Sequence, residues 1–116
     1  MTAIKHLSPS FKAKYKAWFD AQTADNKALR LRLATEGQTP PAMIIACCDS
    51  RLPSSELFGG ETGSSFLYRN IANLVPPAGG TPHCETAAAV EYAVKALKVS
   101  HIIVLGHSQC GGVQGC

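Results

Sequence analysis

The pattern of apolar and polar positions divides the chain into a polar, helical start and a more apolar remainder. Aromatic side chains between residues 9 and 34 recur at the spacing of one helical face, and Ser8 or Ser10 can cap the first turn. The aromatic residues of this stripe are Phe11, Tyr15, Trp18 and Phe19. The pattern predicts one long helix over residues 9–34, whose stripe packs on the core or on another subunit.

Three short apolar runs follow, and each predicts a buried strand: residues 42–47, 65–69 and 101–105. Between them, residues 53–58 predict a short helix that begins with a proline, and residues 85–97 predict a stronger one. The side chains expected to face the sheet from the stronger helix are Ala88, Val90, Val94 and Leu97. This alternation of strands and helices predicts an α/β fold, with a parallel β-sheet core flanked by helices and preceded by the long N-terminal helix.

The domain organisation is simple. Residues 37–41 (GQTPP) break the first helix, so residues 1–36 are expected to form a helical arm and residues 42–116 an α/β core. The sequence stops at Cys116, shortly after a glycine-rich turn that opens another helix. We therefore expect residues 1–116 to be a single domain that is incomplete at its C-terminal end.

Composition narrows the class of protein. The formal net charge of +3 is small, and the early Lys and Arg residues have helical spacing, so we expect no nucleic-acid partner. No apolar run approaches the roughly 20 residues of a membrane span, and the N-terminus lacks the apolar core of a signal peptide. These features predict a cytoplasmic protein without a membrane partner, in which the five cysteines are reduced. Clustered Cys and His residues then indicate metal binding or catalysis before disulfides.

Reactive residues gather in two segments, each at the end of an expected strand. Residues 47–51 (CCDSR) close the first strand, and residues 106–112 (GHSQCGG) follow the third. The carboxyl ends of parallel strands meet at one edge of a sheet, where function usually gathers. If the two strands are neighbours, about 4.8 Å apart, the two segments meet, although the order of the strands cannot be read from the sequence.

These segments supply two thiolates, from Cys47 and Cys110, and the imidazole of His107. This ligand set suits one Zn²⁺ ion and leaves its fourth position free. Gly111 and Gly112 let the backbone approach closely at the second segment. The remaining thiols are expected to be structural: Cys48, which should be buried on the opposite face of the strand, Cys84 and Cys116.

Asp49 and Arg51 have a role beside such a metal. A zinc ion with two thiolates and a neutral histidine has no net charge, so it acidifies a bound water less than a three-histidine site does. Asp49 can accept a hydrogen bond from zinc-bound hydroxide and orient it, while Arg51 holds the carboxylate bidentately and keeps it ionised. Asp49 could instead become a fourth zinc ligand and close the site. An ordinary salt bridge at the strand end is the simpler alternative.

The motif C-x-D-x-R at Cys47–Arg51, followed by H-x-x-C-G-G at His107–Gly112, resembles the β-class carbonic anhydrases. These zinc enzymes are carbonate dehydratases, which hydrate CO₂ reversibly to bicarbonate and a proton. The similarity begins near Gln38 and includes FLYRNIANLVPP. The resemblance implies the same three ligands for one Zn²⁺ per subunit, the same Asp–Arg pair, and attack of zinc-bound hydroxide on CO₂.

The resemblance also implies a substrate pocket and an assembly. Phe66, Ile71 and Tyr92 would line a small apolar pocket for CO₂, and Gln38 would donate a hydrogen bond to substrate or bicarbonate. The family's N-terminal helix embraces a partner subunit, and its active site lies at the subunit interface. A homodimer or a larger homo-oligomer is therefore expected.

Other functions fit parts of the sequence. HIIVLGHSQCGG is similar to the nucleophile elbow of an α/β-hydrolase with Ser108 as the nucleophile, but the elbow needs glycine where Cys110 stands. A non-catalytic, structural zinc module would keep Asp49 as a permanent fourth ligand. A relative that acts on a CO₂-like molecule such as carbon disulfide would share the zinc ligands.

Overall fold

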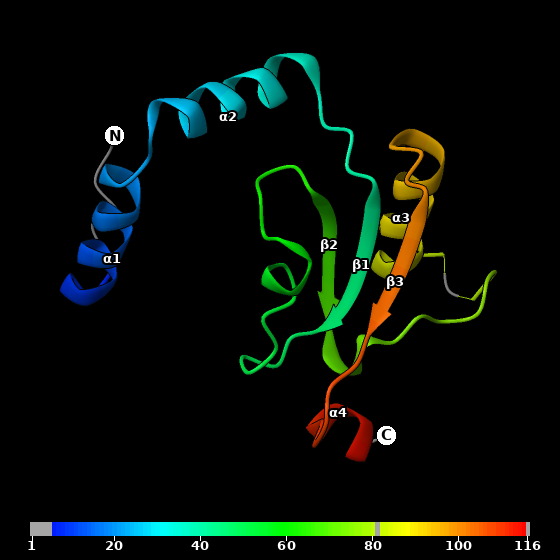
Figure 1. Ribbon diagram of the computed structural model, residues 1–116. Helices are drawn as coiled ribbons and strands as arrows, with labels where there is room; N and C mark the ends of the chain where they lie inside the picture. Colours follow the sequence, from blue (N-terminus) through cyan, green and yellow to red (C-terminus); the bar gives the residue numbers. More distant parts are fainter. Residues whose placement is uncertain (1–5, 81, 116) are drawn as a thin grey trace. The chain divides into compact units, whose positions relative to one another are not determined.

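The computed structural model describes residues 6–80 and 82–115. The chain divides into two compact units, the first ending at Glu36 and the second beginning at Gly37. The first unit is helical, and the second holds a three-stranded sheet with short helices (Figure 1). No helix in the described part of the chain combines the length and the apolar character that a membrane crossing requires.

The described residues of the first unit form two helices, α1 (Pro9–Asp20) and α2 (Ala24–Glu36), so the prediction of one long helix over residues 9–34 is wrong. Side-chain hydrogen bonds at Thr23 explain the break. The Thr23 hydroxyl accepts from the Asn26 N–H at 3.1 Å, and the Asn26 side-chain oxygen accepts from the Thr23 N–H at 3.3 Å. This reciprocal cap satisfies backbone donors at the start of a second helix, and the apolar period alone does not reveal it.

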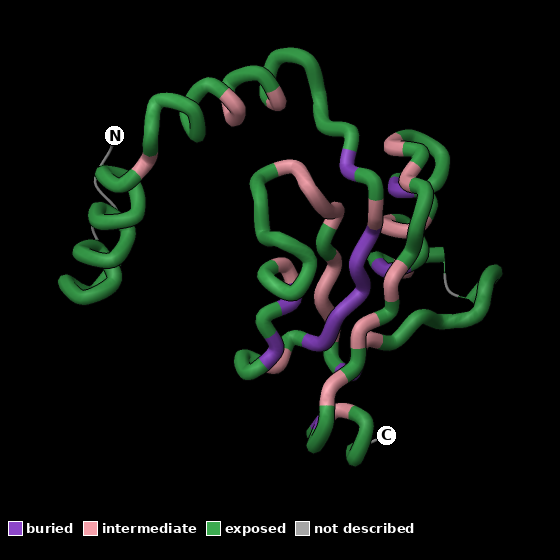
Figure 2. Tube along the Cα trace, in the orientation of Figure 1, coloured by how far each residue is buried: buried purple, intermediate pink, exposed green. Residues whose placement is uncertain are grey.

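The second unit is built on three parallel strands in the order β2-β1-β3. These strands are β1 (Ala42–Cys47), β2 (Ser65–Asn70) and β3 (His101–Leu105). The central strand β1 is buried almost throughout, as the purple segment of Figure 2 shows. The predicted parallel α/β fold is confirmed, and β1 and β3 are indeed neighbours.

One face of the sheet is covered by α3 (Glu85–Glu91), which continues into the π-helical turn η3 (Tyr92–Ala96). The helix-side cluster consists of buried Met43, Ile45 and Ala93, with Phe66, Tyr68, Ala89, Val90 and Val99 packed against them. The predicted helix face is partly wrong, because Ala88 and Val94 are exposed. Several faces of this alanine-rich helix are apolar, and packing selects the one whose small side chains, Ala89 and Ala93, approach the sheet closely.

The opposite face carries the loop-side cluster, which draws on residues beyond the strand ends. Its buried members are Ile44, Ala46, Cys47, Leu52, Ala72 and Cys110. Three short helices lie in these loops: η1 (Glu56–Phe58), η2 (Ile71–Asn73) and α4 (Gly111–Gln114). The expected helix from Pro53 is only the 3₁₀ turn η1, because the Ser54 N–H bonds to the Leu52 carbonyl and Gly59 ends the turn at φ 101°.

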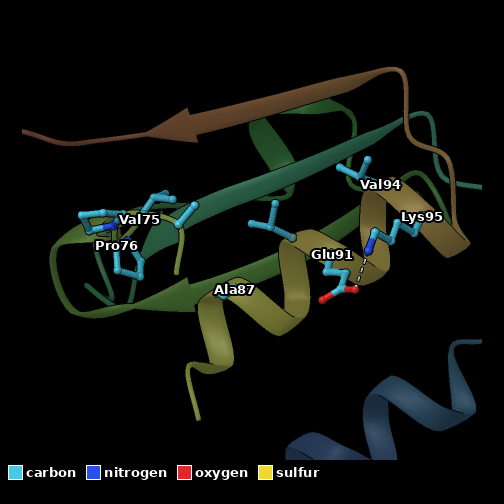
Figure 3. A pocket seen from close by; sticks show the side chains of 9 residues that line it. Val75, Pro76, Ala87, Glu91, Val94 and Lys95 are labelled. Carbon is cyan, nitrogen blue, oxygen red and sulfur yellow. Dashed lines mark hydrogen bonds and ion pairs between the residues drawn. The ribbon is translucent and has the colours of Figure 1, made fainter. Parts of the chain in front are cut away.

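An open apolar groove of about 390 Å³ is lined by the loop after η2 and by residues of α3 and η3 (Figure 3). Its lining includes Val75, Pro76 and Val94. Glu91 and Lys95, which form an ion pair at 2.8 Å, also belong to the lining. None of the lining residues is among the candidate site residues, so this groove is separate from the predicted chemistry.

Candidate metal centre

The carboxyl ends of β1 and β3 lie side by side, as predicted. Ala46 pairs with Leu105 in the parallel register, so the last residue of β1 lies next to the turn that leads from β3 into α4 (Figure 1). The Sγ atoms of Cys47 and Cys110 are 3.8 Å apart, and both residues are buried. Two cysteines that are distant in the sequence therefore form one edge of a compact site.

Cys47, His107 and Cys110 form the metal-compatible group of the described residues, with their ligand atoms all within 4.8 Å of one another. The His107 Nδ1 atom lies 2.9 Å from the Ser108 carbonyl oxygen. Its Nε2 atom is buried and has no hydrogen-bond partner among the described residues. When Nδ1 is protonated and donates to this carbonyl, Nε2 is unprotonated and has a free lone pair. This tautomer of histidine can bind a metal through Nε2. The donor set and this unpartnered nitrogen fit a Zn²⁺ ion.

Cys47 is held as a thiolate by its neighbours. The adjacent imidazole of His107 is the main cause that lowers the pKa of Cys47 to about 6. The same interaction raises the pKa of His107. The backbone N–H of Ala72 also donates to the Cys47 sulfur at 3.4 Å. Because the thiolate is the form that binds metal, the site is prepared for an ion at neutral pH.

Asp49 and Arg51 form a two-pronged ion pair beside this group. The Nε and Nη2 atoms of Arg51 donate to the two carboxylate oxygens of Asp49 at 2.9 and 2.7 Å. This pairing holds the pKa of the Asp49 carboxyl well below its usual range. The Asp49 Oδ2 atom lies 3.8 Å from His107 Nε2. Arg51 also donates to the Gln109 carbonyl at 3.0 Å, so it ties the first segment to the second.

The end of β2 contributes contacts that the sequence analysis did not assign. Arg69 donates to three carbonyl oxygens in residues 47–52. Ala72 is buried at φ 67°, a left-handed conformation that is uncommon for a residue with a β-carbon. The signals in the sequence were the FLYRNIANLVPP segment of the resemblance and a charged residue at the end of an otherwise apolar strand. Neither signal says which loop the side chain reaches.

The four residues assigned to substrate by resemblance lie in different places. Ile71 is next to the centre, because a β-carbon on Gly112 would lie only 2.6 Å from its Cγ2 atom. Phe66 and Tyr92 contact each other, with ring centroids 5.7 Å apart, and Phe66 packs on the helix-side cluster. Gln38 is exposed in the segment before β1. Their common role as a pocket stays a prediction.

The remaining thiols differ from one another. Cys48 is exposed, contrary to the buried position expected from strand alternation, because the chain leaves the sheet at this residue. The Cys84 sulfur accepts a hydrogen bond from the Ala87 N–H at the start of α3. Cys116 lies outside the described residues.

Ser108 is the nucleophile of the α/β-hydrolase alternative, which needs a histidine base beside its hydroxyl. Its carbonyl oxygen is the atom close to the ring of His107. Within residues 6–80 and 82–115, no hydrogen bond joins the Ser108 hydroxyl to a histidine. The geometry therefore offers no Ser–His pair for nucleophilic catalysis in this part of the chain.

A family model described as carbonic anhydrase matches residues 42–116. Beta carbonic anhydrase 3 of Arabidopsis thaliana is 45% identical over 80 residues, which are 69% of this chain and 31% of that protein. The solved structure of the β-carbonic anhydrase CcaA has a TM-score of 0.83 and 33% identity, covering 91% of this chain and 50% of that one. A tetrameric β-carbonic anhydrase of Sordaria macrospora has a TM-score of 0.77 and 40% identity, covering 91% and 51%. The chain thus spans less than a third of the plant relative and about half of the solved structures.

Proposed function

The chain belongs to the β-carbonic anhydrase family, and from this premise we propose that it catalyses the reversible hydration of CO₂ to bicarbonate and a proton. One Zn²⁺ would be held by Cys47, His107 and Cys110. The observation that carries the proposal is the arrangement of ligands. Three side chains converge on one point, while the nearby carboxylate of Asp49 is not part of the group. Three protein ligands with an open fourth position are typical of catalytic zinc.

The zinc ion, when bound, supplies Lewis acidity that makes water a nucleophile at neutral pH. The chain's own residues supply orientation. Asp49 stays ionised because Arg51 pairs with it, so its carboxylate accepts a hydrogen bond from the attacking water and directs a lone pair of that water toward CO₂. Arg51 keeps this carboxylate next to the second segment through its bond to the Gln109 carbonyl.

The paired state of Asp49 favours an open site over one closed by a fourth ligand. Three hydrogen bonds from Arg51 hold the carboxylate, two from the side chain and one from the backbone N–H at 2.9 Å. Moving the carboxylate onto the metal would break or rearrange these bonds. Charge-assisted, bidentate pairs are among the stronger hydrogen bonds of proteins. We therefore assign Asp49 an orienting role, in contrast to the permanent ligand of a structural zinc module.

We extend the proposal to the substrate side of the site. Ile71, next to Gly112, would form part of the apolar wall for CO₂ in the same chain. Phe66 and Tyr92 lie together away from the Cys47 cluster, and Tyr92 is half exposed, so we place them, with Gln38, against the site of a second copy.

A homo-oligomer would bring these residues together. The aromatic stripe of α1 remains exposed, with Phe11 and Trp18 at 60% and 50% exposure, and supplies apolar surface for the contact. The tetrameric relatives from Sordaria macrospora support such an assembly. Sedimentation velocity over a range of concentrations tests it, and a protein that stays monomeric throughout would contradict this part of the proposal.

The catalytic proposal is tested by stopped-flow CO₂ hydration on the zinc-loaded protein. We expect a rate above buffer that disappears on chelation and returns when Zn²⁺ is restored. Stoichiometric zinc without any rate would identify a structural zinc module instead. Labelling of Ser108 by a fluorophosphonate probe, with hydrolysis that survives chelation, would support the hydrolase alternative.

A further inference from the structure

Arg69, on β2, reaches across the sheet to the end of β1. Its Nε atom donates to the Cys47 carbonyl at 2.8 Å, and its Nη2 atom donates to the Asp49 carbonyl at 2.8 Å and the Leu52 carbonyl at 3.2 Å. The side chain is partly buried, and in the strand register Arg69 lies opposite Ala46. One guanidinium therefore contacts the backbone of a zinc-ligand candidate and of the residue that would orient water.

Two of the carbonyls that Arg69 binds, those of Asp49 and Leu52, lie beyond the sheet, and the third belongs to Cys47, the last residue of β1. The ladder between β1 and β2 ends with the bond from the Cys48 N–H to the Asn70 carbonyl at 2.8 Å, after which residues 49–52 turn away. The Asp49 and Leu52 carbonyls also accept backbone bonds, from the N–H groups of Leu52 and Ser54, so Arg69 adds side-chain bonds to a turn that is already closed by its backbone. A planar guanidinium presents several donors in a fixed fork, whereas an ammonium is a point charge that cannot reproduce it.

The same strand end also holds the sulfur of Cys47. The Ala72 N–H donates to this sulfur at 3.4 Å from a left-handed backbone position. Gly112 makes the position possible, since a β-carbon there would lie 2.9 Å from the Ala72 β-carbon. Cys47 is thus fixed at its carbonyl by Arg69 and at its sulfur by Ala72.

We propose that Arg69 is a positioning residue, which sets the placement of Cys47 and Asp49 at the metal centre without touching the substrate. Its effect on metal binding follows from the contacts alone. Its effect on the rate rests on the proposed carbonic anhydrase function. Loss of the guanidinium fork should let residues 47–52 relax, so that the thiolate and the carboxylate no longer have one fixed geometry.

The experiment compares Arg69→Lys, which keeps the charge, and Arg69→Gln with the matched control Lys95→Gln, which removes an exposed cation of η3 that pairs with Glu91. Zinc affinity is measured by competition with a chromophoric chelator. We expect a loss of roughly 10- to 100-fold in both Arg69 variants, the range seen when the supports of metal ligands are removed. In the cobalt-substituted protein, the thiolate-to-metal absorption band should shift, and kcat should fall more than KM rises. Lys95→Gln should match the unaltered protein in every measurement.

Arg69→Lys is the decisive variant if Arg69→Gln does not fold. The inference is overturned if Arg69→Lys keeps the zinc affinity, cobalt spectrum and kcat of the unaltered protein, even if its melting temperature falls, because that result would show a purely structural role. If the unaltered protein binds zinc but hydrates no CO₂, the proposed function fails. The zinc affinity and the cobalt spectrum of the variants then still test whether Arg69 positions the metal centre.

Discussion

The helix-side and loop-side clusters are built on alternate residues of β1, but they differ in how much of each cluster comes from regular secondary structure. The helix-side cluster joins the interior of β1 to a helix, and its members fill space between regular elements. The loop-side cluster takes Cys47, Leu52, Ala72 and Cys110 from the ends of strands and the loops beyond them. In these loops Ala72, Asn73 and Gln109 have positive φ angles of 67°, 46° and 53°.

This difference suggests that the two clusters have different roles: one stabilises the fold, and the other forms the metal centre. Side chains that pack between regular elements need only fill the space available, so their exact atomic positions matter little. A metal centre needs specific atoms at specific points, and strained backbone held by hydrogen bonds can supply them. Substitutions in the helix-side cluster should therefore change the free energy of unfolding, whereas substitutions in the loop-side cluster should change metal binding and rate.

The largest effect is expected for Cys47→Ser. The serine hydroxyl stays protonated at neutral pH and is a poor zinc ligand, so both zinc binding and CO₂ hydration should be lost. Zinc content after dialysis and stopped-flow rates measure the two losses. The control Cys48→Ser alters the adjacent exposed thiol and should keep both. Normal turnover by Cys47→Ser would reject the assignment of the centre.

Met43→Ala tests the helix-side cluster. Met43 is fully buried, so the substitution leaves a cavity and should lower the free energy of unfolding by about 2–5 kcal/mol. Urea denaturation measures this change, and zinc affinity measured on the folded protein should stay the same. The exposed Leu57 provides the control, since Leu57→Ala should change stability by no more than about 0.5 kcal/mol. A large loss of zinc affinity in Met43→Ala would show that the two clusters are not separable.

Asp49→Ala sharpens the comparison within the centre. The three metal ligands remain, so zinc content should be unchanged, while kcat for CO₂ hydration should fall about 100-fold because the attacking water loses its orientation. Glu91→Ala removes the carboxylate of a different ion pair, with Lys95, and should keep the full rate. If Asp49→Ala kept the CO₂ hydration rate of the unaltered protein, the pair of Asp49 and Arg51 would be an ordinary salt bridge with no role in catalysis.

Gly112→Ala tests the close contact between α4 and η2. The new β-carbon would lie 2.6 Å from Ile71 Cγ2 and 3.0 Å from the Ala72 nitrogen, so the protein must shift at the N–H that supports Cys47. We expect about 1–3 kcal/mol lower stability, measured by urea denaturation, together with weaker zinc binding. In Gly111→Ala the new β-carbon meets nothing within 4 Å, and equal effects in the two variants would contradict the steric explanation.

The smallest effect is a pH dependence of the metal-free protein. The folded-state pKa of Cys47, about 6, lies below its ordinary value of 9.0, so its contribution to stability is full above 9.0 and is lost as the pH falls through about 6. His107 acts in the opposite sense, because its raised pKa gives stability that is lost as the pH rises through that pKa. Thiolate ultraviolet absorbance should show one group titrating near 6, and that signal should be absent in Cys47→Ser. The same titration in both proteins would contradict the assignment.

Much of the fold and the centre was predictable because the signals are local. The apolar runs 42–47 and 101–105 form strands with the predicted bounds. The proposed ligands lie at the end of the first of these strands and shortly after the second. Errors arose where several local solutions are nearly equal, as at Thr23, where a side-chain cap starts a second helix, and along α3, where alanine makes more than one face apolar.

The sequence by itself determined which side chains could bind a metal, and that they follow strand ends, because ligand chemistry and strand periodicity are properties of neighbouring residues in the chain. Only the tertiary structure decided that β1 lies between β2 and β3. That order brings the Cys47 and Cys110 sulfurs to 3.8 Å and sends Arg69 to the loop after β1. Neighbours across a sheet are far apart in sequence, and the hydrogen bonds that align them form only when the strands pair.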